Sequence, residues 1–130
     1  MWEAANDIPW ADGGTGVLSV KALAEHCRAA GITVPIQPGI MIITAYGGFT
    51  RMVDFCKSRV PADVRDAIEA VKDSDKDVKA LGLKLCVAMS RRLLVEGSKG
   101  LHFYTLNQDE PVFAILDELG LKKPIPEGLD

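Results

Sequence analysis

The sequence predicts an α/β fold that is mostly helical and contains two parallel strands. Apolar residues recur at three- and four-residue intervals in several segments, and two short runs of β-branched or aromatic residues lie between these segments. Glycine or proline marks most of the boundaries. Strands that alternate with helices pair in parallel, because each helix returns the chain to the starting edge of the sheet.

The first part of the chain is predicted to hold an irregular arm, a helix and a strand. Residues 1–16 contain many turn formers and no period, so they are assigned to the arm. Ser19 is a suitable N-cap for a helix that ends at Gly31. Residues 32–36 form a β-branched run followed by Pro-Gly at residues 38–39, which predicts a buried strand and then a turn.

Helices dominate the middle of the sequence. A helix is predicted over residues 46–58, and Pro61 suits the first turn of the next helix. The longest apolar period begins at Ser74 or Asp75 and ends before Gly97. Acidic residues at its start and arginines near its end match the helix dipole, which supports a single long helix.

A second strand and a last helix follow. Residues 101–106 read as a strand, and residues 109–119 as a helix that ends at Gly120. Residues 122–130 contain two prolines and are assigned to a loose tail. The side chains expected to face inward on the last helix are Val112, Phe113, Leu116 and Leu119.

The number of strands is too small for a complete α/β domain. A doubly wound sheet has more than two strands, and an eight-stranded barrel needs about 250 residues, whereas this sequence has 130. The order of elements therefore fits an incomplete TIM-type (β/α)8 barrel fragment.

Composition excludes several classes of function. Apolar residues make up 48% of the chain, which indicates a folded core, and the net charge of −3 gives no reason to expect nucleic acid or an anionic membrane as partner. No run approaches the ~18 apolar residues of a membrane span. Cys27, Cys56 and Cys86 are an odd, widely spaced set in helical patterns, which indicates buried, reduced thiols in a cytoplasmic protein and no metal site.

Two segments resemble one enzyme family. Residues 29–40 read Ala-Ala-Gly-Ile-Thr-Val-Pro-Ile-Gln-Pro-Gly-Ile, and residues 100–107 read Gly-Leu-His-Phe-Tyr-Thr-Leu-Asn. With Val-Pro-Ala at 60–62 and Ala-Leu-Gly-Leu at 80–83, they resemble the last third of methylenetetrahydrofolate reductases over about residues 20–121.

This resemblance implies a fold, a reaction and its cofactors. Residues 17–121 would be the C-terminal portion of the family's barrel with its seventh and eighth strands, whereas residues 1–16 do not resemble the family. The family's enzymes pass a hydride from NADH or NADPH to FAD and then to the folate substrate, 5,10-methylenetetrahydrofolate, which becomes 5-methyltetrahydrofolate. The family's proton-donor glutamate and most flavin contacts belong to earlier strands. The resemblance therefore assigns no catalytic residue here, leaves the FAD-binding residues unassigned, and implies that the chain alone is inactive.

The resemblance also implies where substrate binds. Barrel active sites lie at the carboxyl ends of the strands, so contacts are expected in loops that start at residues 37–39 and 106–108. The predicted substrate-binding residues are Tyr104, Leu106, Asn107, Gln108 and Met52.

Some of these positions have alternative roles or depart from the family. Asn107 is equally suited to cap the last helix, and Tyr104 suits packing. Gln108 stands where many members carry an arginine that pairs with folate carboxylates, and glutamine lacks that charge. Bacterial relatives place a glutamine and a phenylalanine where this chain has Gly48 and Met52, although a methionine still packs well against a ring.

Two further hypotheses concern other classes of function. An inactive barrel fragment would expose strand edges and apolar faces, so it would associate with the missing barrel part or with itself as an interaction module. A different small enzyme would need a nucleophile with a base, or a metal set, and the sequence shows neither. His26 and His102 have no partner visible in the sequence and are assigned to surface or structural positions.

Overall fold

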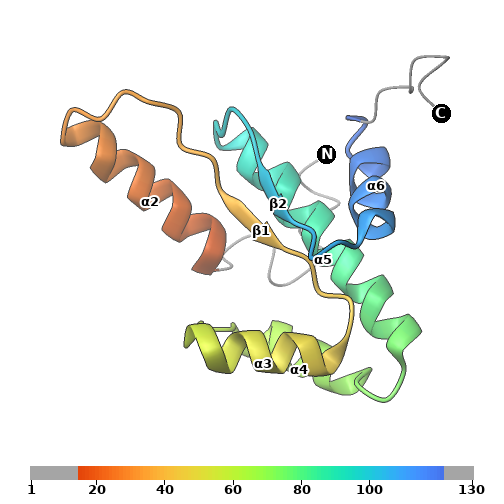
Figure 1. The fold of residues 1–130 in the computed structure, drawn as a ribbon. Coiled ribbons are helices and arrows are strands. Elements are labelled where there is room, and N and C mark those ends of the chain that lie inside the picture. Colours follow the sequence, from red (N-terminus) through yellow and green to blue (C-terminus); the bar gives the residue numbers. More distant parts are fainter. Residues whose placement is uncertain (1–14, 122–130) are drawn as a thin grey trace, which may run out of the picture.

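The computed structural model describes residues 15–121, in which five of the predicted elements and the parallel pairing are confirmed. The predicted tail and residues 1–14 of the predicted arm lie outside the described residues. The elements in order are α2 (Thr15–Ala29), β1 (Gly39–Met41), α3 (Tyr46–Cys56), α4 (Ala62–Ala70), α5 (Asp75–Val95), β2 (His102–Tyr104) and α6 (Asp109–Glu118) (Figure 1).

The first helix begins earlier than predicted. Its first residue is Thr15, and Ser19 lies inside it instead of capping it. The prediction was wrong because Val17 and Leu18 extend the helical period upstream, and a serine costs little within a helix. No helix within residues 15–121 is both long and apolar enough to cross a membrane.

Three helices end at a predicted glycine in the same way. Gly31, Gly97 and Gly120 have positive φ angles of 86°, 104° and 69°. After each glycine, the next backbone N–H donates to a carbonyl five residues earlier; Ile32 N to Cys27 O measures 2.9 Å. This left-handed C-terminal motif satisfies carbonyls that the helix leaves free, and glycine adopts it without steric cost.

The first strand lies later in the sequence than predicted. Residues 32–36 are not a strand, because the Arg28 guanidinium donates to Ile32 O at 2.7 Å and to Val34 O at 2.8 Å and holds this segment as a loop. The strand is instead β1, and the Pro38 carbonyl accepts from His102 N at 2.9 Å. The predicted Pro-Gly turn was therefore wrong. Proline has no backbone N–H to donate, but its carbonyl still accepts a hydrogen bond at the start of a strand.

The two strands pair in parallel, and the partner of the second strand is β1 and not the predicted strand at residues 32–36. Gly39, Ile40 and Met41 lie opposite His102, Phe103 and Tyr104. Gly39 has room only for hydrogen, since a Cβ there would lie 2.6 Å from Cε2 of Tyr104. The tyrosine ring thus packs across the strand pair over the glycine.

One face of the strand pair is covered by helices. Ile40 is buried with Cys86, Leu93 and Ile115, and Phe103 packs against the same cluster. The long helix α5 contacts β1, α2 and α6, so it forms the centre of the helical layer (Figure 1). The opposite face carries Met41, His102 and Tyr104, of which the last two are exposed. The sheet is therefore two-sided: apolar against helices and open on the other face.

The last helix turns a different face inward than expected. Pro111 and Ile115 are its buried residues, and Leu119 packs against the same core, whereas Phe113 is 47% exposed. The prediction was wrong for Phe113, because the buried stripe runs through Pro111, Ile115 and Leu119 at intervals of four residues, and Phe113 lies outside it.

Candidate functional site

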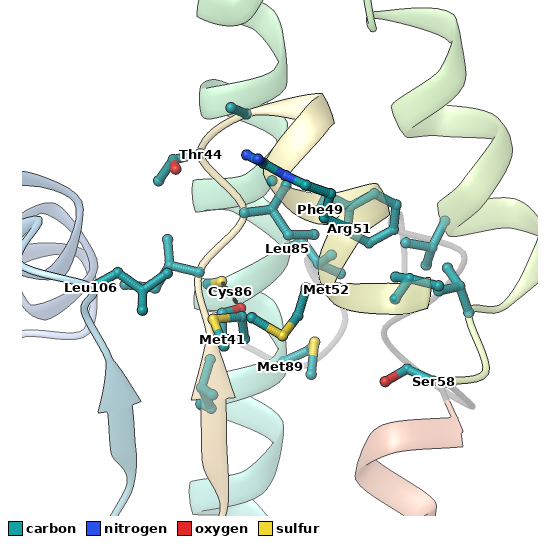
Figure 2. A pocket seen from close by; sticks show the side chains of 18 of the residues that line it. Met41, Thr44, Phe49, Arg51, Met52, Ser58, Leu85, Cys86, Met89 and Leu106 are labelled. Atoms are coloured by element: carbon teal, nitrogen blue, oxygen red, sulfur yellow. Dashed lines mark hydrogen bonds between the residues drawn. The ribbon is translucent and has the colours of Figure 1, made fainter. Parts of the chain in front are cut away.

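A cavity of about 510 Å³ lies beyond the carboxyl end of β1. The segment after β1 runs along it, α3 closes it from above, and residues from α5 and from the α3–α4 connection form its other walls (Figure 2). Its size falls in the range of small-molecule sites. The side chains labelled in Figure 2 are those of Met41, Thr44, Phe49, Arg51, Met52, Ser58, Leu85, Cys86, Met89 and Leu106.

Close packing between α5 and the segment after β1 shapes the cavity. A Cβ at Gly82 would overlap the carbonyl oxygen of Ile43, so this glycine lets the chain pass directly over the helix. The Cys86 thiol points to the Met41 carbonyl oxygen at 3.8 Å, and its burial raises its pKa to about 11. The thiol therefore stays protonated near neutral pH and acts as a packed apolar group.

The structure brings together three of the five predicted substrate-binding residues. Met52 from α3, Leu106 from the turn after β2 and Gln108 at the start of α6 all line the cavity. Tyr104 and Asn107 are not among the lining residues. Their predicted contacts with substrate, like those of the other three, stay predictions.

The turn after β2 adopts a rare backbone conformation. Leu106 and Asn107 have φ angles of 49° and 61°, and Gln108 N donates to Thr105 O at 2.9 Å. Asparagine tolerates this left-handed region, whereas leucine is disfavoured there by roughly 1–2 kcal/mol. Asn107 does not cap α6: the N-cap position is Gln108, which makes no side-chain cap hydrogen bond. Leu106 is 67% exposed, so packing within the described residues does not compensate this cost.

The loop that follows β1 differs from the predicted one. Because β1 ends at Met41, the loop at the strand's carboxyl end is formed by residues 42–45, and residues 37–39 lie at the strand's start. Sequence reasoning therefore missed Thr44 and the neighbouring lining residues. The run Ile40–Ile43, with three isoleucines in four positions, was the signal that could have placed the strand.

The lining is mostly apolar and rich in sulfur. Met41, Met52 and Met89 contribute thioethers, and the only charged side chains among the described lining residues are Arg51 and Arg59. None of these lining residues is a histidine, aspartate or glutamate. The cavity can thus bind an apolar or aromatic group beside a negative charge, but it supplies no side chain suited to general acid or base catalysis.

The cysteines and histidines do not form a site. Cys86 is buried, but Cys27 is half-buried and Cys56 is exposed, so the prediction of three buried cysteines was wrong for two of them. Cys56 lies at the end of α3, a helix that has no buried residue. Within residues 15–121, no three of the side chains His, Cys, Asp and Glu gather as metal ligands would. His102 makes an edge contact with the Tyr104 ring, with centroids 4.9 Å apart.

The described residues do not form a complete flavin site. A bound flavin is held by contacts that bury most of its surface, and the open face of the sheet offers one surface only, formed by Met41, His102 and Tyr104. The described part of the chain therefore does not fit FAD by itself, and no reaction step through the flavin follows from it.

Comparison with known proteins identifies the family. Residues 19–120 match the family described as methylenetetrahydrofolate reductase. The chain is 48% identical over 97 residues to "Probable methylenetetrahydrofolate reductase (NADH)" of Oryza sativa subsp. japonica, a match that covers 75% of this chain and 16% of the relative.

Two other relatives show the same pattern. "Probable methylenetetrahydrofolate reductase (NADPH)" of Caenorhabditis elegans is 39% identical over 104 residues, 79% of this chain and 16% of the relative. "5,10-methylenetetrahydrofolate reductase" of Escherichia coli (strain K12) is 33% identical over 106 residues, 82% of this chain and 36% of the relative. The chain thus spans between about a sixth and a third of these relatives' lengths, and it belongs to the methylenetetrahydrofolate reductase family.

Proposed function

We propose that residues 17–121 supply the strand-seven and strand-eight part of a TIM-type (β/α)8 barrel that reduces 5,10-methylenetetrahydrofolate to 5-methyltetrahydrofolate. The barrel would use FAD and a nicotinamide donor. The observation that carries the proposal is the two-sided sheet, whose parallel strands have helices on one face and Met41, His102 and Tyr104 on the other. A barrel segment has this arrangement, because its outer face meets helices and its inner face meets the other strands' side chains.

The chain would contribute one wall of the ligand site. Met52 is placed to pack its flexible thioether against an aromatic ring, and Gln108 offers a neutral amide that donates and accepts hydrogen bonds. Leu106 would exclude water at the same rim. Arg51 adds a positive charge, which suits an anionic part of a folate or nicotinamide ligand better than a neutral one.

The chain by itself would not catalyse the reduction. Among the described residues, the cavity lining has no acid or base, and the Cys86 thiol stays protonated because burial raises its pKa to about 11. Each strand also has an unpaired edge, since the described sheet has two strands. Such edges and the open face favour association with the remaining barrel part over independent catalysis.

A flavin titration of the purified full chain tests this proposal. We expect no stoichiometric flavin absorbance after incubation with FAD. Binding of one flavin per chain would contradict the proposal, because it would require a complete site within these residues.

Complementation gives the positive test. The Oryza sativa relative, shortened by the region that matches this chain, would be co-expressed with the full chain and assayed for folate reduction with NADH and with NADPH. We expect activity only when both polypeptides are present. Met52→Glu in the cavity should abolish it, whereas Phe55→Glu on the exposed side of the same helix should not. A stable complex without activity would favour the interaction module instead.

A further inference from the structure

The place of α3 decides the shape of the cavity. Its side chains Arg51 and Met52 line the cavity, and so does Cys86 on α5. Yet α3 has no buried residue, and its N-cap Ala45 makes no side-chain hydrogen bond. A helix with few buried contacts opens at lower free energy than the core. The position of α3 over the cavity must therefore come from a small number of specific contacts.

One of these contacts reaches across to α4. The two helices lie beside each other (Figure 1), and the Tyr46 hydroxyl donates to the Glu69 carboxylate at 2.6 Å. A hydrogen bond to an ionised acceptor is stronger than one between neutral groups. Lys72 Nζ donates to the same carboxylate at 2.6 Å and so holds it in place. Arg51, by contrast, donates to Gly47 O within α3 and does not fix the helix against its neighbours.

Tyr46 joins this polar contact to the apolar wall of the cavity. Its half-buried ring packs against the cluster of Val64, Ile68 and Leu85. Val64 on α4 and Leu85 on α5 also line the cavity. Tyr46 is the first residue of α3, so a ring that is held at both its face and its hydroxyl fixes the first turn of the helix.

We propose that Glu69 is a positioning residue of the ligand site. Through Tyr46 it holds α3 in the place where Met52 and Arg51 face the cavity. Loss of the bond lets α3 move away, which opens the cavity and displaces both side chains. Glu69 is exposed, so the bond adds little to the stability of the whole fold, and its effect lies in the population of the closed arrangement. The role in ligand binding rests on the function proposed above, whereas the effect on α3 does not.

Chemical labelling of Cys86 tests the effect on α3. This thiol lines the cavity and is 2% exposed, so a reagent reaches it when the wall opens. The full chain would be treated with methyl methanethiosulfonate and each cysteine followed by mass spectrometry. We expect Tyr46→Phe and Glu69→Ala each to raise the rate at Cys86 several-fold, and the double variant to raise it no further, because both remove the same bond. Glu69→Gln keeps an acceptor oxygen and should restore most of the protection.

Glu96→Gln is the matched control. The Glu96 carboxylate also accepts from two cations, Lys21 Nζ at 3.1 Å and Arg92 Nη2 at 2.8 Å, but it does not line the cavity. We expect this variant to leave the rate at Cys86 unchanged. Unchanged labelling in both Tyr46→Phe and Glu69→Ala would overturn the proposal. So would additive effects in the double variant, or an equal increase in Glu96→Gln, which would indicate opening of the whole fold.

The complementation assay with the shortened Oryza sativa relative tests the role in ligand binding. We expect Glu69→Ala to raise KM several-fold and to leave kcat unchanged, because the displaced side chains contact the ligand equally in the ground state and the transition state. A lower kcat with an unchanged KM would overturn the positioning role. If the wild-type pair shows no reductase activity, the proposed function fails, and the labelling of Cys86 alone decides whether Glu69 holds α3.

Discussion

Helices α5 and α3 differ in burial, in N-capping and in the residue at the C-terminal end. α5 has seven buried residues, an N-cap Ser74 whose side chain accepts from Asp77 N at 3.3 Å, and Gly97 after its end. α3 has no buried residue, its N-cap Ala45 makes no side-chain hydrogen bond, and Lys57 stands in the left-handed position where α2, α5 and α6 have glycine. Both helices line the cavity, but α5 is anchored by buried side chains and α3 is not.

The difference shows how stability is distributed in this fold. The core under the sheet unites β1, α5 and α6 around Ile40, Cys86, Leu93 and Ile115. The second cluster unites α4 and α5 around Val64, Ile68 and Leu85, and α3 adds only half-buried side chains to it. Segments with few buried contacts open at lower free energy than the core. The wall of the cavity formed by α5 is therefore rigid, whereas the wall formed by α3 moves more easily.

Matched isoleucine truncations should show the largest effect. Ile115 and Ile68 are 0% and 1% exposed, one in each cluster. We expect Ile115→Ala to lower the free energy of unfolding by about 4 kcal/mol and Ile68→Ala by about 2 kcal/mol, because Ile68 packs with Val64 and Leu85, which line the cavity and can relax more easily. Urea unfolding followed by circular dichroism measures both. Equal losses would show that the two clusters are one cooperative core.

A pair of glycine substitutions should give the next largest difference. Gly82→Ala forces a methyl group into the Ile43 carbonyl, so we expect a loss of about 3 kcal/mol. Gly48→Ala meets no atom within 4 Å and lies in α3, where we expect a gain of about 0.5–1 kcal/mol from helix propensity. Thermal unfolding of both variants checks the signs. A neutral Gly82→Ala would mean that the segment after β1 shifts freely over α5.

The helices could be predicted from the sequence because their ends and faces carry local signals. Ser74, Gly97 and Gly120 act within one turn of the backbone, so their roles needed no tertiary information. The position of β1 could not be predicted, since residues 32–36 and 40–43 are both rich in β-branched side chains and either segment suits a strand. The choice depends on Arg28, whose guanidinium binds the first segment's carbonyls.

The candidate site was predictable only in part for the same reason. Met52, Leu106 and Gln108 could be chosen from a family pattern, and the structure places them on one cavity. The contributions of Met89 and Arg59 depend on how α3 and the following connection fold over α5. That arrangement requires the contact between Gly82 and Ile43, which no local spacing in the sequence reveals.

Substitutions at the C-terminal ends of α3 and α5 should give a smaller difference in stability between the two helices. Lys57 has a φ of 52° and occupies the position that glycine fills at the ends of α2, α5 and α6. We expect Lys57→Gly to raise the free energy of unfolding by about 1 kcal/mol, because it removes the left-handed penalty at an exposed site. Gly97→Lys at the end of α5 should lower it by a similar amount. Chemical denaturation curves of both variants check whether the two helix ends are equivalent.

The smallest expected effect concerns the polar contact between α3 and α4. The Glu69 carboxylate accepts from Lys72 Nζ and from the Tyr46 hydroxyl, each at 2.6 Å, and these bonds, with Lys72 first, lower the pKa of Glu69 below 4.5. The bond to Glu69 raises the pKa of Tyr46 above 10.0. A lowered carboxyl pKa stabilises the fold above its ordinary value and loses this contribution as pH falls through the lowered one. A raised tyrosine pKa stabilises below 10.0 and loses its contribution as pH rises through the raised value.

Stability measured against pH should therefore decline at both ends more steeply in the wild type than in Tyr46→Phe. Glu69→Gln should flatten the acidic decline further, whereas Glu25→Gln on α2, outside this cluster, should leave both declines unchanged. All three groups are solvent-accessible, so the effect is small and salt should weaken it. If amide exchange in α3 follows the same pH dependence while exchange in α5 does not, this contact is what joins the mobile wall of the cavity to the rigid one. If both helices respond alike, the wall formed by α3 unfolds only with the whole chain, and the contrast between the two helices has no consequence for the cavity.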